Sequence, residues 1–333
     1  MKYSPGKNKD ITVVVQGYVD KEITKKCLSS IRKVIPGSKI ILSTWENSKL
    51  DGLSYDTLIL NEDPGFYYRS VQLIDGKLVK KKINNINRQI ISTRNGLRAV
   101  TTKFSLKLRS DFLLKHSRFI ERFEELKYLN SFDREYKIFK NRLLCCQCGT
   151  YKVNKGRTRL PYHYSDLAYF GLTNDLINLF EIPLATDQEL KYFENIGLNR
   201  KKETWATNQY NCEQTVIKNW LIKNKKSLDF QYSTHASKKN IQDSEKYLIN
   251  NFLPLSYSKF GLSPTKDHLK YNFHFRYYKT YYTENDWLKL YKKYQDSTLK
   301  IPLIDRERLL IIASRNTPKF FRTPIVKKAS NYL

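Results

Sequence analysis

The sequence has no long apolar run, although 40% of its 333 residues are hydrophobic. A membrane-spanning helix needs about 18 or more consecutive apolar residues, whereas "ITVVV" and "KIILS" have only the length of strands. The first residues, "MKYSPGK", lead into polar positions without the apolar core of a signal peptide. We therefore expect a cytoplasmic protein without a spanning helix.

Cysteine is scarce, and its number is odd: Cys27, Cys145, Cys146, Cys148 and Cys212. In a reducing compartment the default state of such residues is the free thiol. The cluster at 145–148 has no second cluster at zinc-finger spacing, so we expect no zinc site there. The sequence also has no glycine-rich phosphate loop and no Gly-x-Ser-x-Gly motif, which argues against nucleophilic hydrolase chemistry.

Acidic residues are few relative to basic ones. The chain has 32 Asp plus Glu against 60 Lys plus Arg, a formal net charge of +28. Such a surface attracts nucleic acid phosphates, anionic lipid headgroups or acidic glycans, and the charge alone does not choose among them. The stretch "YNFHFRYYKTYYTENDWLKLYKKY" interleaves aromatics with cations, which suits either single-stranded nucleic acid or a membrane interface.

The elements expected from residue patterns alternate between strands and helices. The β-branched run at 11–15 predicts a fully buried parallel strand, and the apolar spacing over 24–34 predicts a helix. Further predicted strands are 39–43, 57–60, 104–108, 162–171 and 224–233, with helices at 87–99 and from about Cys212, and a hairpin around Asp75-Gly76. This order predicts an α/β sheet with parallel strands.

Polar residues follow four of these strands where each one ends. They are Gln16-Gly17-Tyr18, then 43–46, then 61–65, and then Arg109-Ser110-Asp111. In α/β sheets, ligands bind beyond the carboxyl ends of the strands. The last segment, "LKLRSDFLL", also places Lys107, Arg109 and Asp111 on alternate positions, which indicates one charged face.

Five blocks in this order, "ITVVVQG", "IILSTWE", "LILNEDPG", "NINRQIISTRNGL" and "LKLRSDFLL", resemble the WavE-type lipopolysaccharide-synthesis proteins. The resemblance implies an α/β GT-A-like domain over 8–245, with a mixed, mostly parallel central sheet flanked by helices. Its nucleotide-sugar-binding half would be 8–115 and its acceptor half 116–245. Residues 246–333 would form a basic, aromatic-rich helical extension packed on that domain.

The activity implied by the resemblance is glycosyl transfer. The donor would be a nucleotide sugar, and the acceptor a lipid-linked or oligosaccharide precursor of lipopolysaccharide or capsule. The enzyme would sit at the inner face of the cell membrane, held there peripherally by its basic surface. The alternative function is nucleic-acid binding on an α/β scaffold, with oligonucleotides as the discriminating ligand.

The donor-site residues expected from the strand ends and the resemblance are Gln16, Gly17, Thr44, Trp45, Glu46, Asn61, Asp63, Arg88, Asn95, Arg109 and Asp111. Arg109-Ser110-Asp111 stands where GT-A enzymes carry an Asp-x-Asp metal motif, so only Asp111 keeps its carboxylate. Two alternatives stay open: Mg²⁺ or Mn²⁺ at Asp111, or direct contact of Arg109 with the diphosphate. No organic cofactor is expected.

An inverting transfer needs a base to deprotonate the acceptor hydroxyl, and a carboxylate suffices. The candidates are Asp166 and Glu213, both of which follow the nucleotide half. Glu213 also suits the first turn of a helix, where an acid is good capping chemistry. Asp166, among Tyr162, Tyr164 and Tyr169, also suits binding of an acceptor sugar. A retaining mechanism stays open.

Overall fold

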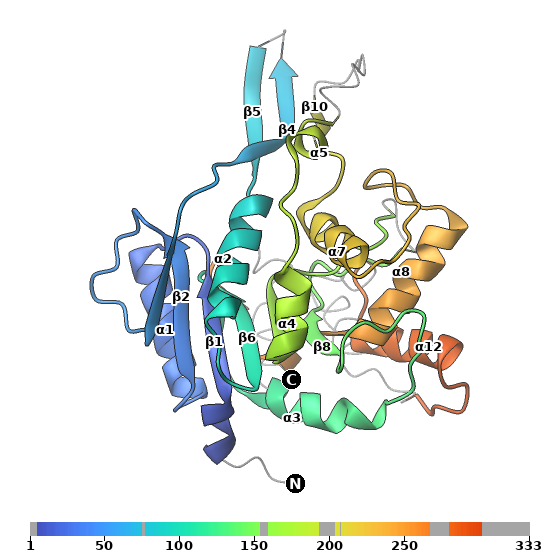
Figure 1. The fold of residues 1–333 in the computed structure, drawn as a ribbon, viewed down its shortest axis with the longest axis horizontal. Coiled ribbons are helices and arrows are strands. Elements are labelled where there is room, and N and C mark those ends of the chain that lie inside the picture. Colours follow the sequence, from blue (N-terminus) through green and yellow to red (C-terminus); the bar gives the residue numbers. More distant parts are fainter. Residues whose placement is uncertain are drawn as a thin grey trace, which may run out of the picture.

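A seven-stranded mixed sheet forms the centre of the molecule (Figure 1). The computed structural model describes residues 5–74, 77–153, 159–192, 204–206, 208–266 and 280–301. The strand order is β11-β8-β9-β6-β1-β2-β3. The bounds are β1 Ile11–Gln16, β2 Lys39–Trp45, β3 Thr57–Asn61, β6 Phe104–Arg109, β8 Leu143–Cys146, β9 Ala168–Leu172 and β11 Phe252–Leu255.

Most neighbouring strands of this sheet run parallel, as the sequence predicted. Strand β1 pairs in parallel with both β2 and β6, and β2 with β3. Only β9 runs the other way, between β6 and β8. All six residues of β1 are buried, which explains its continuous apolar character, because a parallel strand is covered on both faces.

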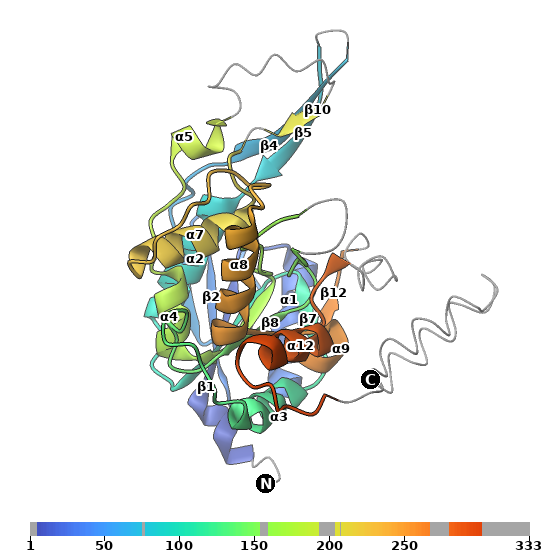
Figure 2. The ribbon, with the colours of Figure 1, turned by 90° about the vertical axis from the view of Figure 1, so that its right-hand side faces the viewer.

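Helices cover both faces of the sheet (Figure 2). One face carries α2 (Ile86–Arg98), α4 (Thr173–Phe180) and α7 (Cys212–Lys223); α1 (Lys21–Val34), α9 (Tyr257–Phe260) and the small sheet of β7 (Phe112–Leu114) and β12 (Leu262–Pro264) lie on the other side. The remaining described elements are η1 Pro5–Asp10, α3 Arg118–Glu125, η2 Leu126–Tyr128, α5 Asp187–Leu190, α8 Lys238–Asn251 and α12 Glu284–Tyr294. Among the helices of the described ranges, none has the length and apolarity needed to cross a bilayer.

A three-stranded sheet projects beyond the body of the molecule (Figure 1). The antiparallel hairpin of β4 (Tyr67–Ile74) and β5 (Lys77–Asn84) forms most of it, and β10 (Thr204–Ala206) pairs with β4. The predicted hairpin is therefore confirmed. Its turn residues, Asp75 and Gly76, lie outside the described residues.

Two predicted strands were wrong in part or whole. Over 162–171 only the end is a strand, beginning at Ala168. Tyr162 and Tyr164 are buried against α8 instead: the Tyr162 N–H and the Tyr164 hydroxyl donate to Ser244. Residues 224–233 form no strand, because side chains rather than a neighbouring strand bind their carbonyls. Tyr210 donates to Phe230 O at 2.7 Å, for example.

The predicted boundary at residue 245 falls inside α8. Beyond it, β11 joins the central sheet beside β8, so the C-terminal segment is not purely helical and shares the main core. Strand β11 can contain Pro254 because it lies at the edge of the sheet, where one of its sides makes no backbone hydrogen bonds to a neighbouring strand. Residues 267–279 and 302–333 lie outside the described residues.

Close approach of α2 to the sheet predicts a sensitive glycine. A Cβ on Gly96 would lie 2.5 Å from Val14 Cγ1 and 3.1 Å from Ser43 Cβ. We expect Gly96→Ala to lower the free energy of unfolding by about 1–3 kcal/mol, because overpacking outweighs the gain in helix propensity. Urea denaturation measures this change. Ser29→Ala, at an exposed position of α1, is the control. An equal loss of stability in both variants would contradict the close packing of α2 on the sheet.

Candidate functional site

The ends of β1, β2, β3 and β6 meet at one edge of the sheet, which we call the carboxyl edge. Gln16 lies beside Ser43 on one side and Arg109 on the other, and Trp45 lies beside Asn61. Strand β9 begins opposite Leu108. Asp166, two residues before β9, therefore reaches the same edge from the opposite chain direction.

Three of the predicted donor-site residues form a buried network under this edge. Ser92 of α2 donates to Gln16 Oε1 at 2.8 Å, and Asn95 of α2 donates to Asn61 Oδ1 at 2.8 Å. Asn61 also donates to Ser43 Oγ at 3.1 Å. Gln16 and Asn61 are only 4% and 3% exposed. Their polar groups thus fasten α2 to the strand ends, which satisfies buried donors and acceptors.

The chain leaves β1 through a tightly held turn. Gly17 has φ +111°, a conformation that favours glycine, and its carbonyl accepts a hydrogen bond from Thr44 Oγ1 at 2.9 Å. Ser110 Oγ donates to Tyr18 O at 2.6 Å. The Tyr18 side chain is nevertheless 75% exposed. The sequence placed this aromatic at the end of a predicted strand but did not identify it as a donor-site residue.

Four other predicted residues lie at the more open part of the edge. Asp63 and Arg88 form a bidentate ion pair, with Nε to Oδ1 at 2.7 Å and Nη2 to Oδ2 at 2.6 Å. The guanidinium of Arg88 lowers the pKa of Asp63. Trp45 is half-buried and Glu46 is exposed. The structure therefore brings these four positions to one edge, and it already pairs Asp63 with Arg88.

Arg109 and Asp111 form the second bidentate pair. Arg109 Nε donates to Oδ1 at 3.1 Å and Nη2 to Oδ2 at 2.7 Å, while Lys266 Nζ lies 2.9 Å from Oδ2. Burial alone would raise the pKa of Asp111, but Arg109 and Lys266 outweigh it and lower that pKa. Lys266 was not predicted as a site residue, because nothing in its local sequence marks it.

Lys107, two residues before Arg109 on β6, is fully buried. Its Nζ donates to the carbonyl oxygen of Asp166, and Asp166 itself is 7% exposed. Burial lowers the pKa of Lys107 from 10.5 to about 8, against the opposing pull of the Asp166 carboxylate. Burying a charged amine lowers the stability of the fold. Shifted pKa values of this kind are often found at functional sites.

The lowered pKa of the buried Lys107 amine predicts that the stability of the fold depends on pH. The unfolded chain holds this proton up to about pH 10.5 and the folded chain releases it near pH 8, so the unfolded state binds more protons in between. The free energy of unfolding should therefore rise with pH across that window, by up to about 3 kcal/mol relative to Lys107→Met. Urea denaturation of both proteins from pH 7 to 10.5 measures the difference; a constant difference would contradict the assigned cost.

Glu213 lies in the first turn of α7 and faces His163. His163 Nδ1 lies 2.7 Å from Gly149 O and must be the donor of this hydrogen bond, since a carbonyl oxygen can only accept. The other ring nitrogen, Nε2, lies 3.4 Å from Glu213 Oε2. The Glu213 side chain is 25% exposed and that of His163 only 7%. Nε2 of His163 thus faces the Glu213 carboxylate, a contact that the sequence did not indicate, since a single histidine has no diagnostic spacing.

The described residues at this edge do not fit a divalent metal ion. Hard cations take several oxygen ligands, and within the described ranges no group of three His, Cys, Asp or Glu residues is placed to hold one. The carboxylate of Asp111 already binds two cations, Arg109 and Lys266. Their charges oppose the approach of a third.

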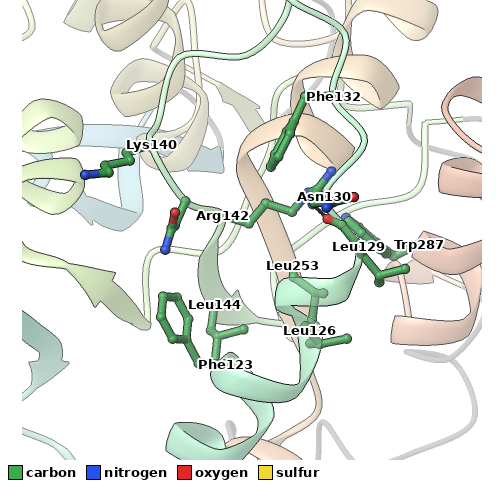
Figure 3. Close-up of a pocket in the computed structure, with 11 residues that line it drawn as sticks. Phe123, Leu126, Leu129, Asn130, Phe132, Lys140, Arg142, Leu144, Leu253 and Trp287 are labelled. Carbon is green, nitrogen blue, oxygen red and sulfur yellow. Dashed lines mark hydrogen bonds between the residues drawn. The ribbon is translucent and has the colours of Figure 1, made fainter.

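A separate pocket of about 120 Å³ lies near the start of β8 and β11 (Figure 3). Arg142 points into it but donates to three backbone carbonyls, those of Leu129, Ser131 and Ile249. The amino group of Lys140 points away from Arg142 in this view. Arg142 therefore holds neighbouring backbone segments together, which is a structural role. The functional residues expected from the sequence lie at the carboxyl edge instead.

Many solved structures are similar to this chain, among them one from Streptococcus pneumoniae and one from S. aureus. The apo-form glycosyltransferase GlyE of Streptococcus pneumoniae TIGR4 has 14% sequence identity and a TM-score of 0.29, over 67% of this chain and 44% of that one. TarS of S. aureus has 12% identity and a TM-score of 0.36, over 72% and 43%. This chain therefore spans less than half the length of either.

No curated protein matches the chain. The family model described as WavE lipopolysaccharide synthesis matches residues 11–320, nearly the whole sequence. This match agrees with the five sequence blocks along the first third of the chain. The chain therefore belongs to the WavE lipopolysaccharide synthesis family.

Proposed function

We propose that this chain is a GT-A-type glycosyltransferase that moves a sugar from a nucleotide-sugar donor to a lipopolysaccharide or capsular glycan. The observation that carries the proposal is the meeting of four strand ends at the carboxyl edge, with Arg109, Arg88 and the exposed Tyr18 beside them. Ligands of α/β sheets bind at such edges. Membership in a lipopolysaccharide synthesis family supports the choice of product.

The donor is proposed to lie along the carboxyl edge. Tyr18 and Trp45 offer aromatic faces for the base, and Gly17 lets the backbone come close to it. The Asp63–Arg88 pair offers polar groups to the ribose. Gln16, Thr44, Asn61 and Asn95 act indirectly in this proposal, because their hydrogen bonds hold the loops that carry the contacting residues.

The acceptor is proposed to approach Glu213. This carboxylate is more exposed than Asp166 and lies beside His163. In an inverting reaction it would take the proton of the acceptor hydroxyl as that oxygen attacks the sugar. Asp166, whose carbonyl binds Lys107, is assigned a positioning role at the same edge.

Peripheral attachment to an anionic membrane is part of the proposal, because a lipid-linked acceptor would be presented there. The net charge of +28 supports it, since each basic residue near an anionic leaflet contributes about 1 kcal/mol. Flotation with vesicles that contain phosphatidylglycerol measures this attachment. Equal recovery with neutral vesicles would remove it from the account.

A panel of nucleotide sugars tests the proposed activity. The expected result is that nucleoside diphosphates raise the thermal unfolding temperature and that at least one nucleotide sugar is consumed when acceptor glycan is added. Stabilisation by oligonucleotides alone would favour nucleic-acid binding, which the basic surface also suits. Neither ligand class changing the unfolding temperature would reject the carboxyl edge as a nucleotide site.

A further inference from the structure

A single carboxylate at the carboxyl edge is held by two cations from distant parts of the chain. Asp111 binds Arg109 at the end of β6 and Lys266 just after β12. The backbone fastens the same two segments, because Thr265 N and Oγ1 both donate to Asp111 O, at 3.2 and 2.8 Å. The meeting of the three charges is thus fixed by the fold.

The two cations, rather than the carboxylate, face solvent. The side chains of Arg109 and Lys266 are 31% and 48% exposed, whereas that of Asp111 is 11% exposed. Arg109 uses Nε and Nη2 for Asp111, which leaves Nη1 available for another acceptor, and an ammonium group has three donors. The trio therefore has a net charge of +1 and N–H donors that an anion could use.

We propose that Arg109 and Lys266 form a metal-independent clamp for the diphosphate of the donor, with Asp111 as the positioning residue that holds both cations. The clamp rests on the proposed function, because the diphosphate is the leaving group of that transfer. It takes the place of the metal ion for which the donor set is unsuited. Planar guanidinium and phosphate geometries match in a bidentate contact.

The chemical step needs no further reactant. The acceptor oxygen forms a bond to the anomeric carbon, and the bond between that carbon and the phosphate oxygen breaks with its electron pair staying on the diphosphate. The acceptor proton goes to Glu213. The negative charge that grows on the diphosphate is met by Arg109 and Lys266, which are already in place.

Calorimetric titration of the full chain with inorganic pyrophosphate tests the clamp, once with EDTA and once with MgCl₂. We expect binding in EDTA and no tighter binding in MgCl₂, because Mg²⁺ itself chelates pyrophosphate and competes with the two side chains. Arg109→Ala and Lys266→Ala should each weaken binding by about tenfold, the size of one charge-assisted contact. Asp111→Asn should keep binding, because it removes a negative charge but keeps an oxygen acceptor.

Arg32→Ala is the matched control. Arg32 also pairs with an aspartate, Asp56, and is 34% exposed, but it lies near the starts of β2 and β3. Its loss should leave pyrophosphate affinity unchanged, and circular dichroism verifies the fold of each variant. Binding that requires Mg²⁺ and disappears in Asp111→Asn would overturn the clamp in favour of a carboxylate-bound metal.

The result separates the clamp from the proposed function. If the chain binds pyrophosphate through Arg109 in EDTA but consumes no nucleotide sugar, the clamp stands and the proposed transfer is rejected. If transfer occurs only with added Mg²⁺ or Mn²⁺, the transfer stands and the clamp is rejected.

Discussion

Glu213→Gln is expected to slow sugar transfer by a factor of about 10² to 10⁴, the usual contribution of a general base. The amide keeps the size of the side chain but cannot accept the proton of the acceptor hydroxyl. Donor affinity should change little, because Glu213 lies beside His163 rather than beside the Arg109–Asp111 pair. Steady-state kinetics with the donor found in the nucleotide-sugar panel measures both quantities.

Glu22→Gln is the control that separates catalysis from helix capping. Glu22 is the first-turn acid of α1, as Glu213 is of α7. Removing either charge should lower stability by the same few tenths of a kcal/mol. A transfer rate for Glu213→Gln close to that of Glu22→Gln would reduce Glu213 to a capping residue and return the base role to Asp166.

Arg109→Ala is the second change with a large expected effect, a loss of about 10² to 10³ in transfer rate. This is the size of the loss when one group that stabilises transition-state charge is removed. Arg109→Lys should recover only part of the rate, since an ammonium cannot make the bidentate contact. Asp111→Ala should abolish transfer as well, because it frees both cations while the backbone bonds to Thr265 remain.

The fold should survive these changes at Arg109 and Asp111. The pair lies at the end of a strand, and the Arg109 side chain is 31% exposed, so each substitution removes an ion pair rather than apolar core packing. Rate loss accompanied by a collapse of the cooperative urea transition would mean that the pair is structural. An unchanged rate in Arg109→Ala would remove Arg109 from the reaction altogether.

The parallel half of the sheet follows directly from residue type. The run "ITVVV" of β1 is apolar at every position because the strand is covered on both sides. The apolar spacing over 24–34 likewise predicted α1, and Pro36-Gly37 directly after it explains why the helix ends there. Family membership was also accessible, because the five ordered blocks contain these same strand ends.

The other half of the fold depends on contacts between residues that are far apart in the sequence, which a short stretch of sequence cannot reveal. The stretch around Tyr162 and Tyr164 alternates aromatic and polar residues as a strand does, but both tyrosines donate hydrogen bonds to Ser244 of α8. Residues 224–233 have Leu228, Phe230 and Tyr232 at alternate positions, yet their carbonyls bind Tyr210 and Asn240 side chains. Local patterns identify what a segment prefers, and tertiary partners decide what it pairs with.

The candidate site shows the same division. The alternation of Lys107, Arg109 and Asp111 in one strand predicted a charged feature, and the structure places Lys107 and the Arg109–Asp111 pair close together. The partners from elsewhere, Lys266 and His163, could not be found from spacing, because they reach the edge from segments far along the chain. The internal bonds of Gln16 and Asn61 were also beyond local inference.

Hydrogen exchange with and without nucleoside diphosphate, followed by mass spectrometry, tests the central claim most directly. A donor at the carboxyl edge should slow exchange in peptides that cover 16–19, 43–46, 61–66 and 107–114, while the pocket around Arg142 stays unchanged. Exchange that slows around Arg142 and not at these strand ends would contradict the placement of the donor site.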